Sequence, residues 1–387
     1  MSHRLFATCI PGLEEVLAKE LSALGYEPRI GRGVVEVFAA SLRDAMVMNL
    51  HLRTASRVLW HLFDVERPTK QRLYHAINSF DWRPWFQGMP IMAVDVPFVA
   101  HHEFSNTLYV AQLAKDAICD MLRQKTGQRP SVDPKAPQIQ FSLIMDEQKA
   151  SLSFDTSLEP LFKRGYRTEG AEAPLKETLA AALLMLSEYT PEAILLDPCC
   201  GGGTFLIEAG LMATNTAPGL LRKTFGFTRH PEYLSEEWDA VRSQALSAVT
   251  PFPKGRLFGC EREVRNYRLL LRCIARAGLM DIIEVHNCDF REAKLPVRPN
   301  FIITNPPFGV RLGEAKRWLP LYKTLGDLMK RETAKPAVGA VLTASSDLAR
   351  EINLRPRKKI RVSHGGLDCS FNIYDLYDVR ETQDLSS

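Results

Sequence analysis

The sequence predicts an α/β protein in which two small α+β units precede a larger unit built on a parallel sheet. At 387 residues the chain is too long for one ordinary hydrophobic core, so several domains are expected. Up to residue 162, helical periodicity mixes with strand-like runs. Beyond residue 163, short continuous apolar runs alternate with helical stretches, which is typical of a parallel sheet covered on both faces. We therefore expect three domains, spanning residues 1–52, 53–162 and 163–387.

The first domain is predicted from two helices and one strand. Residues 11–26 carry apolar side chains at helical spacing, and Gly25 closes this helix. Residues 34–38 are strand-like, and residues 41–47 are again helical. This pattern indicates a small α+β unit.

The second domain is predicted from a strand, a long helix and a hairpin. Residues 91–96 are strand-like, and residues 108–124 have one apolar helical face. Two strand-like runs, 141–145 and 150–154, flank the polar residues 146–149, which is a hairpin pattern.

The third domain follows a connector at residues 161–167 and a helix around residues 175–186. Its expected strands are five short apolar runs: residues 193–196, 257–260, 282–285, 301–303 and 338–342. A glycine-rich turn separates the first run from the helical residues 205–212.

Composition and charge restrict the classes of function. The formal net charge of +4 allows a nucleic-acid partner without requiring one. No apolar run approaches the roughly 20 residues of a membrane span, and Glu14 and Glu15 interrupt the start too early for a signal peptide. We expect a cytoplasmic protein. The eight cysteines lack metal-ligand spacing, so reduced thiols and no metal site are predicted.

The glycine turn carries the first chemical signal. Its sequence is Asp-Pro-Cys-Cys-Gly-Gly-Gly-Thr, and its candidate cofactor-binding residues are Asp197, Pro198, Gly201, Gly203 and Thr204. Glycines between a strand and a helix let a ligand approach the backbone at the carboxyl edge of the sheet. The turn alone suits NAD, a nucleotide phosphate or S-adenosylmethionine, or a tight turn without a ligand.

Two acidic residues narrow the choice of cofactor. Glu261 follows the second strand, where its carboxylate can accept hydrogen bonds from ribose hydroxyls, and Asp289 follows the third, where it can accept from an adenine amino group. Glu261 lies 58 residues after Gly203, whereas NAD-binding proteins place the ribose acid about 20 residues beyond the glycines. The turn also lacks the Lys-Ser/Thr ending of a phosphate loop. A cleft of carboxylates suits a sulfonium cation, so S-adenosylmethionine is the expected cofactor.

The segment Asn305-Pro306-Pro307-Phe308 ends the fourth strand and supplies the candidate catalytic residues. An exocyclic amino group is a poor nucleophile because its lone pair is delocalised into the base. The Asn305 side-chain oxygen and the Pro306 carbonyl can each accept a hydrogen bond from that amino group, and this aims the lone pair at the methyl donor. Phe308 offers a stacking face for the base.

The tetrapeptide leaves other possibilities open. It could be a strand terminator with a packed phenylalanine. As a catalytic segment, it does not distinguish adenine N6, cytosine N4, guanine N2 or a glutamine amide.

Longer segments around these motifs resemble a known family. Residues 197–209 and 305–312 are similar to THUMP-domain class I RNA methyltransferases, most of all to the bacterial enzymes that make N2-methylguanosine in 23S ribosomal RNA (the amino-terminal half of RlmL). The connector at 163–167 with the helix start at 173–180, and the insertion at 217–227, also resemble that group. Segments 52–57 and 365–369 extend the resemblance over nearly the whole chain.

The resemblance implies a ferredoxin-like domain, a THUMP domain that binds RNA, and a seven-stranded Rossmann-like methyltransferase domain. It implies that the glycine turn holds the methionine end of the cofactor, and that Asn305 lies against both cofactor and target guanine. Gly202 departs from the serine that is usual in the family. The resemblance covers only the amino-terminal half of the long bacterial enzyme, and the 7-methylguanosine-forming domain of that enzyme is not part of it, so we expect only guanine-N2 methylation.

Several alternatives stay open at this level. They are a tRNA guanine-N2 methyltransferase, a DNA amino-methyltransferase, and a catalytically inactive RNA-binding factor. Basic side chains that could contact RNA phosphates, or be ordinary surface charges, are Lys163, Arg164, Arg167, Lys176, Arg222 and Arg311. No protein partner can be inferred.

Overall fold

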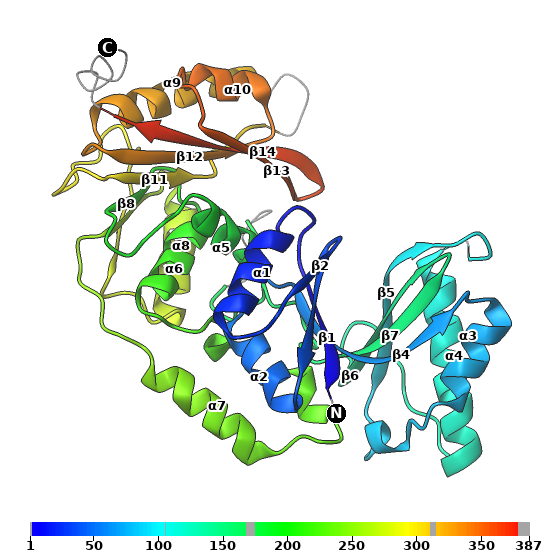
Figure 1. Ribbon diagram of the computed structural model, residues 1–387. Helices are drawn as coiled ribbons and strands as arrows, with labels where there is room; N and C mark the ends of the chain where they lie inside the picture. Colours follow the sequence, from blue (N-terminus) through cyan, green and yellow to red (C-terminus); the bar gives the residue numbers. More distant parts are fainter. Residues whose placement is uncertain (1, 105, 168–174, 310–314, 378–387) are drawn as a thin grey trace. The chain divides into compact units, whose positions relative to one another are not determined.

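The structure is a computed structural model, and it describes residues 2–104, 106–167, 175–309 and 315–377 (Figure 1). The chain divides into two compact units. The first contains Met1–Cys9, Leu17–Leu161 and Arg222–Gln244, and the second contains Ile10–Val16, Phe162–Leu221 and Ala245–Ser387. Among the described residues, no helix combines the length and the apolar character that crossing a bilayer demands.

The first unit is built on a seven-stranded sheet with the order β2-β3-β1-β4-β7-β6-β5. Its strands are β1 (His3–Thr8), β2 (Arg29–Gly31), β3 (Val34–Ala39), β4 (Arg57–Glu66), β5 (Met92–Ala100), β6 (Ile139–Asp146) and β7 (Lys149–Asp155). Neighbouring strands are antiparallel except for the parallel pair β5 and β6. The predicted hairpin is confirmed, because β6 and β7 pair with Phe141 opposite Phe154.

This sheet runs through the expected boundary between residues 52 and 53. Strand β4 pairs with β1 on one side and with β7 on the other. The two amino-terminal domains therefore share one sheet, which the sequence pattern did not reveal.

Helices cover the sheet of the first unit, and their ends follow local capping chemistry. They are α1 (Glu14–Ala23), α2 (Leu42–His51), α3 (Lys70–Ser79) and α4 (Thr107–Thr126), together with the short helix η1 (Arg83–Phe86). Helix α4 begins where the Asn106 side chain accepts a 2.7 Å hydrogen bond from the Tyr109 N–H, and it ends at Gly127 with a φ of 74°. Helices α3 and α4 lie side by side (Figure 1).

Residues 222–244 belong to the first unit, although we expected them within the third domain. They contain the short helix η3 (Gly226–Arg229) and most of α7 (Ser235–Ser247). The rings of Phe225 and Phe227 are stacked with centroids 4.9 Å apart. A Cβ on Gly226 would lie 2.1 Å from the Asp155 carbonyl oxygen, so the segment packs tightly against the end of β7.

The second unit contains a sheet of seven strands in the order β10-β9-β8-β11-β12-β14-β13. They are β8 (Leu195–Asp197), β9 (Leu257–Cys260), β10 (Ile283–His286), β11 (Phe301–Thr304), β12 (Ala337–Thr343), β13 (Lys358–His364) and β14 (Leu367–Leu376). Each of the five predicted runs forms one strand. The sheet is not wholly parallel, because β14 is antiparallel to both β12 and β13.

Helices cover both faces of this second sheet (Figure 1). They are α5 (Glu177–Leu186), α6 (Thr204–Ala213), α8 (Val264–Arg276), α9 (Ala315–Arg331) and α10 (Ser346–Glu351), with the short helix η2 (Pro218–Leu221). One core contains Leu183, Leu206 and Leu270, and the other contains Phe258, Tyr322 and Leu348. Because apolar side chains leave both faces of the strands, every residue of β8, β9 and β11 is buried, whereas the edge strand β10 is only partly buried.

Candidate active site

Four predicted site segments meet at the carboxyl edge of the second sheet. Leu195 lies opposite Leu257 of β9 and Phe301 of β11, so the three strands end close together. Asp197 is the last residue of β8, and Asn305 follows β11 directly. Parallel strands bring their carboxyl ends to one edge, and ligands of open α/β sheets bind in the crevice outside that edge.

The glycine turn is shaped by close packing on one side and open space on the other. Gly201 and Gly203 have φ values of 51° and 73°, in the left-handed region that glycine tolerates. A Cβ on Gly203 would lie 2.2 Å from Leu270 Cδ1, whereas a Cβ on Gly201 would meet nothing within 4 Å. The backbone at Gly201 is therefore accessible to a ligand. Pro198 and Thr204 are buried beside it.

Asp197 is a carboxylate held away from water. Its side chain accepts a 3.2 Å hydrogen bond from the Cys199 N–H, and the residue is 2% exposed. Burial, with a smaller contribution from the charge of Glu261, raises the pKa of Asp197 to about 7. A cation placed beside this carboxylate would favour its ionised form.

Glu261 lies next to the glycine turn. Its carboxylate accepts a 2.7 Å hydrogen bond from the Glu263 N–H, while the Glu261 N–H donates to the His286 carbonyl of β10. Burial raises the pKa of Glu261. Burial and the charges of Asp197, Glu261 and Asp289 also raise the pKa of the Cys199 thiol well above its ordinary value. The negative charges of these three carboxylates therefore all act on Cys199, in the glycine turn.

Asp289 forms a bidentate ion pair with Arg291, two residues further along the chain. Its two oxygens accept hydrogen bonds from Arg291, with Nε–Oδ1 and Nη2–Oδ2 distances of 2.8 and 2.6 Å. These hydrogen bonds lower the pKa of Asp289. An adenine amino group at Asp289 would have to use a remaining lone pair.

Asn305 presents an unsatisfied acceptor. Its Oδ1 atom is buried and has no hydrogen-bond partner among the described residues. A buried polar atom without a partner costs free energy, so it indicates a place that a ligand donor fills. Pro306 is buried, Pro307 is exposed, and Phe308 is half-buried against both cores of the second unit.

The predicted RNA-contacting residues lie in different environments, and two of them are held by contacts within the protein. Arg164 is 1% exposed and lies 3.5 Å from the buried Glu208, so its burial argues against a contact with RNA. Arg222 donates to the carbonyl oxygens of Pro160, Ser157 and Glu159 over 2.9–3.1 Å, and it anchors the inserted segment.

Lys163 and Lys176 are exposed, and Lys176 lies over the Phe162 ring. Arg311 lies outside the described residues.

Arg167 lies at the glycine turn. It donates to Glu177 Oε1 at 2.8 Å and to Thr204 Oγ1 at 3.1 Å. A Cβ on Gly202 would lie 3.6 Å from its Nη1 atom, so this guanidinium borders the turn. The sequence of the connector did not predict that Arg167 lies at the glycine turn, because this contact joins segments that only the fold brings together.

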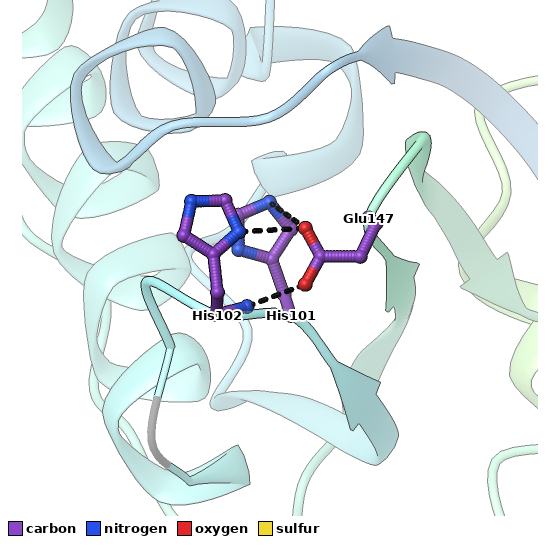
Figure 2. A group of neighbouring side chains, drawn as sticks. All are labelled: His101, His102 and Glu147. Carbon is purple, nitrogen blue, oxygen red and sulfur yellow. Dashed lines mark hydrogen bonds and ion pairs between the residues drawn. The ribbon is translucent and has the colours of Figure 1, made fainter.

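The first unit contains a separate polar cluster of His101, His102 and Glu147 (Figure 2). Glu147 accepts from the His102 N–H at 2.7 Å, lies 2.6 Å from His102 Nδ1 and lies 3.8 Å from His101 Nε2. The residue types could hold a metal ion. However, His101 Nδ1 accepts a hydrogen bond from the Glu103 N–H, so a neutral His101 carries its proton on Nε2, where a metal would bind. The bonds drawn in Figure 2 link the β6–β7 turn to the residues after β5 without a metal.

Family models match three parts of the chain. The model described as UPF0020, an RMKL-like methyltransferase domain, matches residues 164–373. An RlmL ferredoxin-like domain matches residues 4–59, and a THUMP domain matches residues 68–155. These matches confirm the family resemblance and the fold class expected from the sequence.

Individual relatives agree with the family models. The ribosomal RNA large subunit methyltransferase K/L of Marinomonas sp. is 34% identical over 376 residues, which cover 95% of this chain and 52% of that protein. The chain thus spans about half the length of the curated relatives it matches.

Solved structures resemble the chain over nearly its full length. SMU.472, a candidate methyltransferase complexed with SAH, is 26% identical with a TM-score of 0.84, and the match covers 97% of this chain and 98% of that one. A predicted N6-adenine-specific DNA methylase from Listeria monocytogenes is also 26% identical with a TM-score of 0.84, covering 97% and 96%.

Proposed function

The chain belongs to the RMKL-like methyltransferase family, and on that premise we propose that it methylates the exocyclic N2 of a guanine in RNA. S-adenosylmethionine is the proposed methyl donor, and 23S ribosomal RNA is the favoured substrate. The buried, unpartnered Oδ1 of Asn305 carries the proposal, because it is a hydrogen-bond acceptor at the sheet edge where a substrate amino group would complete it.

The residues of the crevice fit this methyl donor. The backbone at Gly201 is open, and Glu261 lies beside the turn as an acceptor for ribose hydroxyls. The carboxylates of Asp197, Glu261 and Asp289 give the crevice a negative potential, which suits a sulfonium cation better than a pyrophosphate. When bound, S-adenosylmethionine supplies an electrophilic methyl group on a positively charged sulfur. The relative SMU.472 is complexed with SAH, which supports this choice.

Arg167 fits the methionine end of S-adenosylmethionine, whereas Glu261 fits its ribose. Its guanidinium borders Gly202 and donates to Thr204, the first residue of α6. A carboxylate at this point would meet both an arginine and the amino-terminal end of a helix. We therefore assign Arg167 to the carboxylate of the methionine moiety and not to RNA.

Asn305 and Pro306 would orient the target amino group. Two acceptors, the Asn305 side-chain oxygen and the Pro306 carbonyl, can take the two amino hydrogens of guanine. The lone pair of the nitrogen then points away from both acceptors and is less delocalised into the ring. Most of the rate enhancement would come from this orientation and from fixed dipoles, so no strong base is needed at the amino group.

Phe308 would hold the plane of the base. It is half-buried against both cores, so its ring has a fixed backing with one part accessible. Stacking of a base on an aromatic ring contributes roughly 1–3 kcal/mol and does not depend on the identity of the base. The choice of guanine and the choice of 23S ribosomal RNA therefore rest on the family and its relatives.

Substitution of Asn305 tests the proposal. We expect Asn305→Ala to lower kcat by about 100-fold or more, the effect of removing one preorganised polar group at a reacting centre. Its affinity for SAH, measured by calorimetry, should stay within a few-fold of wild type. Product would be measured by nucleoside mass spectrometry of protein-free 23S ribosomal RNA after incubation with enzyme and cofactor.

Parallel reactions separate the alternatives. N2-methylguanosine formed only in tRNA would transfer the function to tRNA, and N6-methyladenine formed in DNA would refute the RNA assignment. Retained SAH binding with no methylation of any of these nucleic acids would refute the enzymatic proposal. Near-normal turnover by Asn305→Ala would refute the proposed role of the tetrapeptide.

A further inference from the structure

A groove lies on one face of the second sheet, beside α10. Its volume is about 1040 Å³. Its floor includes Ser370 and Asn372 of β14, and its walls come from β13, α10 and the segment between them. Helix α10 is only six residues long, so it leaves the β13–β14 end of this face uncovered.

The strand register directs two cations into this groove. In β13, Lys359 lies opposite Asn372 and Arg361 lies opposite Ser370. Side chains alternate between the faces of a strand, and opposed residues share a face. Lys359 and Arg361 therefore share the groove face and are exposed, whereas Val362 points into the core on the other side.

The groove is strongly positive. Four basic residues line it: Arg350, Arg355, Lys359 and Arg361. Arg350 forms an exposed ion pair with Asp347, but no carboxylate of the described chain lies within ion-pair distance of the other three. Asp368 is the one acidic residue among the described lining residues. Three cations with no carboxylate partner among the described residues favour binding of an anion with several charges.

The groove opens next to the candidate active site. Thr343, Ser345 and Ser346 are among its lining residues, and Thr343 is the last residue of β12. Strand β12 pairs in parallel with β11, where Thr304 lies opposite Val341. Adjacent strands are about 4.8 Å apart, so the lining residues at the end of β12 and Asn305 occupy neighbouring positions on the same edge.

The chemistry of the lining favours a phosphate backbone over bases. The cations stand beside hydroxyl and amide groups of Ser345, Ser346 and Asn353, all of which can donate to phosphate oxygens. The one aromatic residue among the described lining residues, Tyr374, is 1% exposed and offers no stacking face. An enzyme that reacts with a base either acts on a single strand or flips the base out of a duplex. In the single-stranded case, the phosphates next to the target base are free to follow a positively charged groove.

We propose that this groove binds the phosphate backbone of the single-stranded RNA next to the target guanine. The inference rests on the proposed function for its substrate, but it adds a binding site that the motifs do not include. Phosphates in the groove would fix the strand so that one nucleotide lies at Asn305. Because the contacts are to phosphate, they would contribute to affinity for every RNA sequence.

The double variant Lys359→Ala/Arg361→Ala tests the groove. The probe is a fluorescein-labelled oligouridylate, and its binding to the full chain with SAH present is measured by anisotropy over a range of KCl concentrations. Each lost phosphate contact lowers the slope of log K against log salt by about 0.7 for a single strand, so the double variant should lose about 1.4. Its affinity at low salt should fall several-fold.

Matched variants provide the controls. Lys254 is exposed and precedes β9 at the opposite edge of the sheet, so Lys254→Ala should leave the slope unchanged. Lys359→Arg keeps the charge and should keep wild-type binding. In methylation of 23S ribosomal RNA, the double variant should raise KM several-fold and change kcat less than twofold.

The outcomes distinguish this inference from the proposed function. If the double variant has the salt slope and KM of wild type, or if Lys254→Ala has the same effect, the groove does not bind RNA. If the salt slope changes as expected but no RNA is methylated by the wild type, the groove is supported and the proposed activity fails.

Discussion

The buried carboxyl of Asp197 predicts an unusual dependence of stability on pH. Burial raises its pKa from an ordinary value of 3.8 to about 7. At 1.36 kcal/mol for each pKa unit, ionisation of Asp197 in the folded protein costs about 4 kcal/mol in the absence of a ligand. The substitution Asp197→Asn removes this cost, and the amide oxygen can still accept the hydrogen bond from the Cys199 N–H.

The sign follows from the proton balance. Below about pH 4 the carboxyl is protonated in both the folded and the unfolded chain, and the cost is absent. Between about pH 4 and pH 7 the folded state binds more protons at this site, so the site's contribution to stability is lost as the pH rises through the folded pKa. Above about pH 7 the carboxyl is ionised in both states, so the folded protein carries the full ionisation cost of about 4 kcal/mol. Asp197→Asn should therefore match wild type near pH 4 and exceed its free energy of unfolding by up to about 4 kcal/mol at pH 8.

The assay is urea unfolding of wild type and variant without cofactor at several pH values, with the difference between the two as the readout. Other titrating groups are common to both proteins and cancel. Asp289→Asn is the control of opposite sign, because Arg291 lowers the pKa of Asp289 and its ionised form is the stabilised one. That variant should lose stability at neutral pH and approach wild type in acid.

Two results would refute this reasoning. One is a difference between Asp197→Asn and wild type that does not change with pH. The other is a variant less stable than wild type at pH 8. For the proposed cofactor, the same linkage requires affinity to rise with pH up to about 7 and to level off above it, because a cationic ligand favours the ionised carboxylate.

Three further substitutions test the glycine turn and a buried ion pair. Gly203→Ala should lower the free energy of unfolding by about 1–3 kcal/mol in urea titrations, because its Cβ would lie 2.2 Å from Leu270 Cδ1 at a positive φ. Gly201→Ala has open space around its Cβ, so it should cost less stability but weaken SAH binding in calorimetry; the reverse order would contradict the assigned faces of the turn. Arg164→Leu should destabilise by about 3–5 kcal/mol, because it leaves Glu208 buried without its cation. The affinity of the folded variant for RNA should equal that of wild type. A loss of RNA binding without a loss of stability would instead show that Arg164 contacts RNA.

The carboxyl edge of the second sheet could be predicted because parallel strands impose it. Once residues 193–196, 257–260 and 301–303 are identified as neighbouring parallel strands, the residues that follow them meet at one edge, whatever the loops between them contain. Asp197, Glu261 and Asn305 come together for this reason alone. The sequence could not predict which hydrogen bonds each of these side chains already makes, such as those that Arg291 donates to Asp289.

Pairing across long stretches of chain was harder to predict. Strand β1 lies between β3 and β4, and β4 continues to β7, so the hydrogen bonds of one sheet join residues about 90 positions apart. The antiparallel strand β14 was not among the five predicted runs, although apolar and polar side chains alternate strictly over residues 367–373. Those five runs were identified as continuous apolar segments, a pattern that does not select an alternating strand. Local patterns identify strands, but they carry little information on which distant strand is the partner.

Charge was the least reliable guide to function. Arg164 and Arg167 stand in one basic connector, yet Arg164 is buried against Glu208, 44 residues away, and Arg167 borders the glycine turn. The partner of a buried arginine depends on tertiary contacts, so a basic run in the sequence cannot separate a phosphate contact from an internal ion pair. Lys359 and Arg361 were not predicted as RNA contacts, because only the register of β13 shows that both lie on the face that lines the groove.

The second unit places two opposite electrostatic environments at neighbouring strand ends. Carboxylates of Asp197, Glu261 and Asp289 surround the crevice at β8–β10, whereas the groove beside β12 has three cations that pair with no carboxylate in the described part of the chain. A polyanion in the groove would be repelled by the crevice, and a cation in the crevice would be repelled by the groove. If both proposals hold, an RNA strand would keep its phosphates at the groove and present only an uncharged base to Asn305. The charge distribution would then favour base entry over backbone entry, and it would do so for any sequence that the base-binding residues accept.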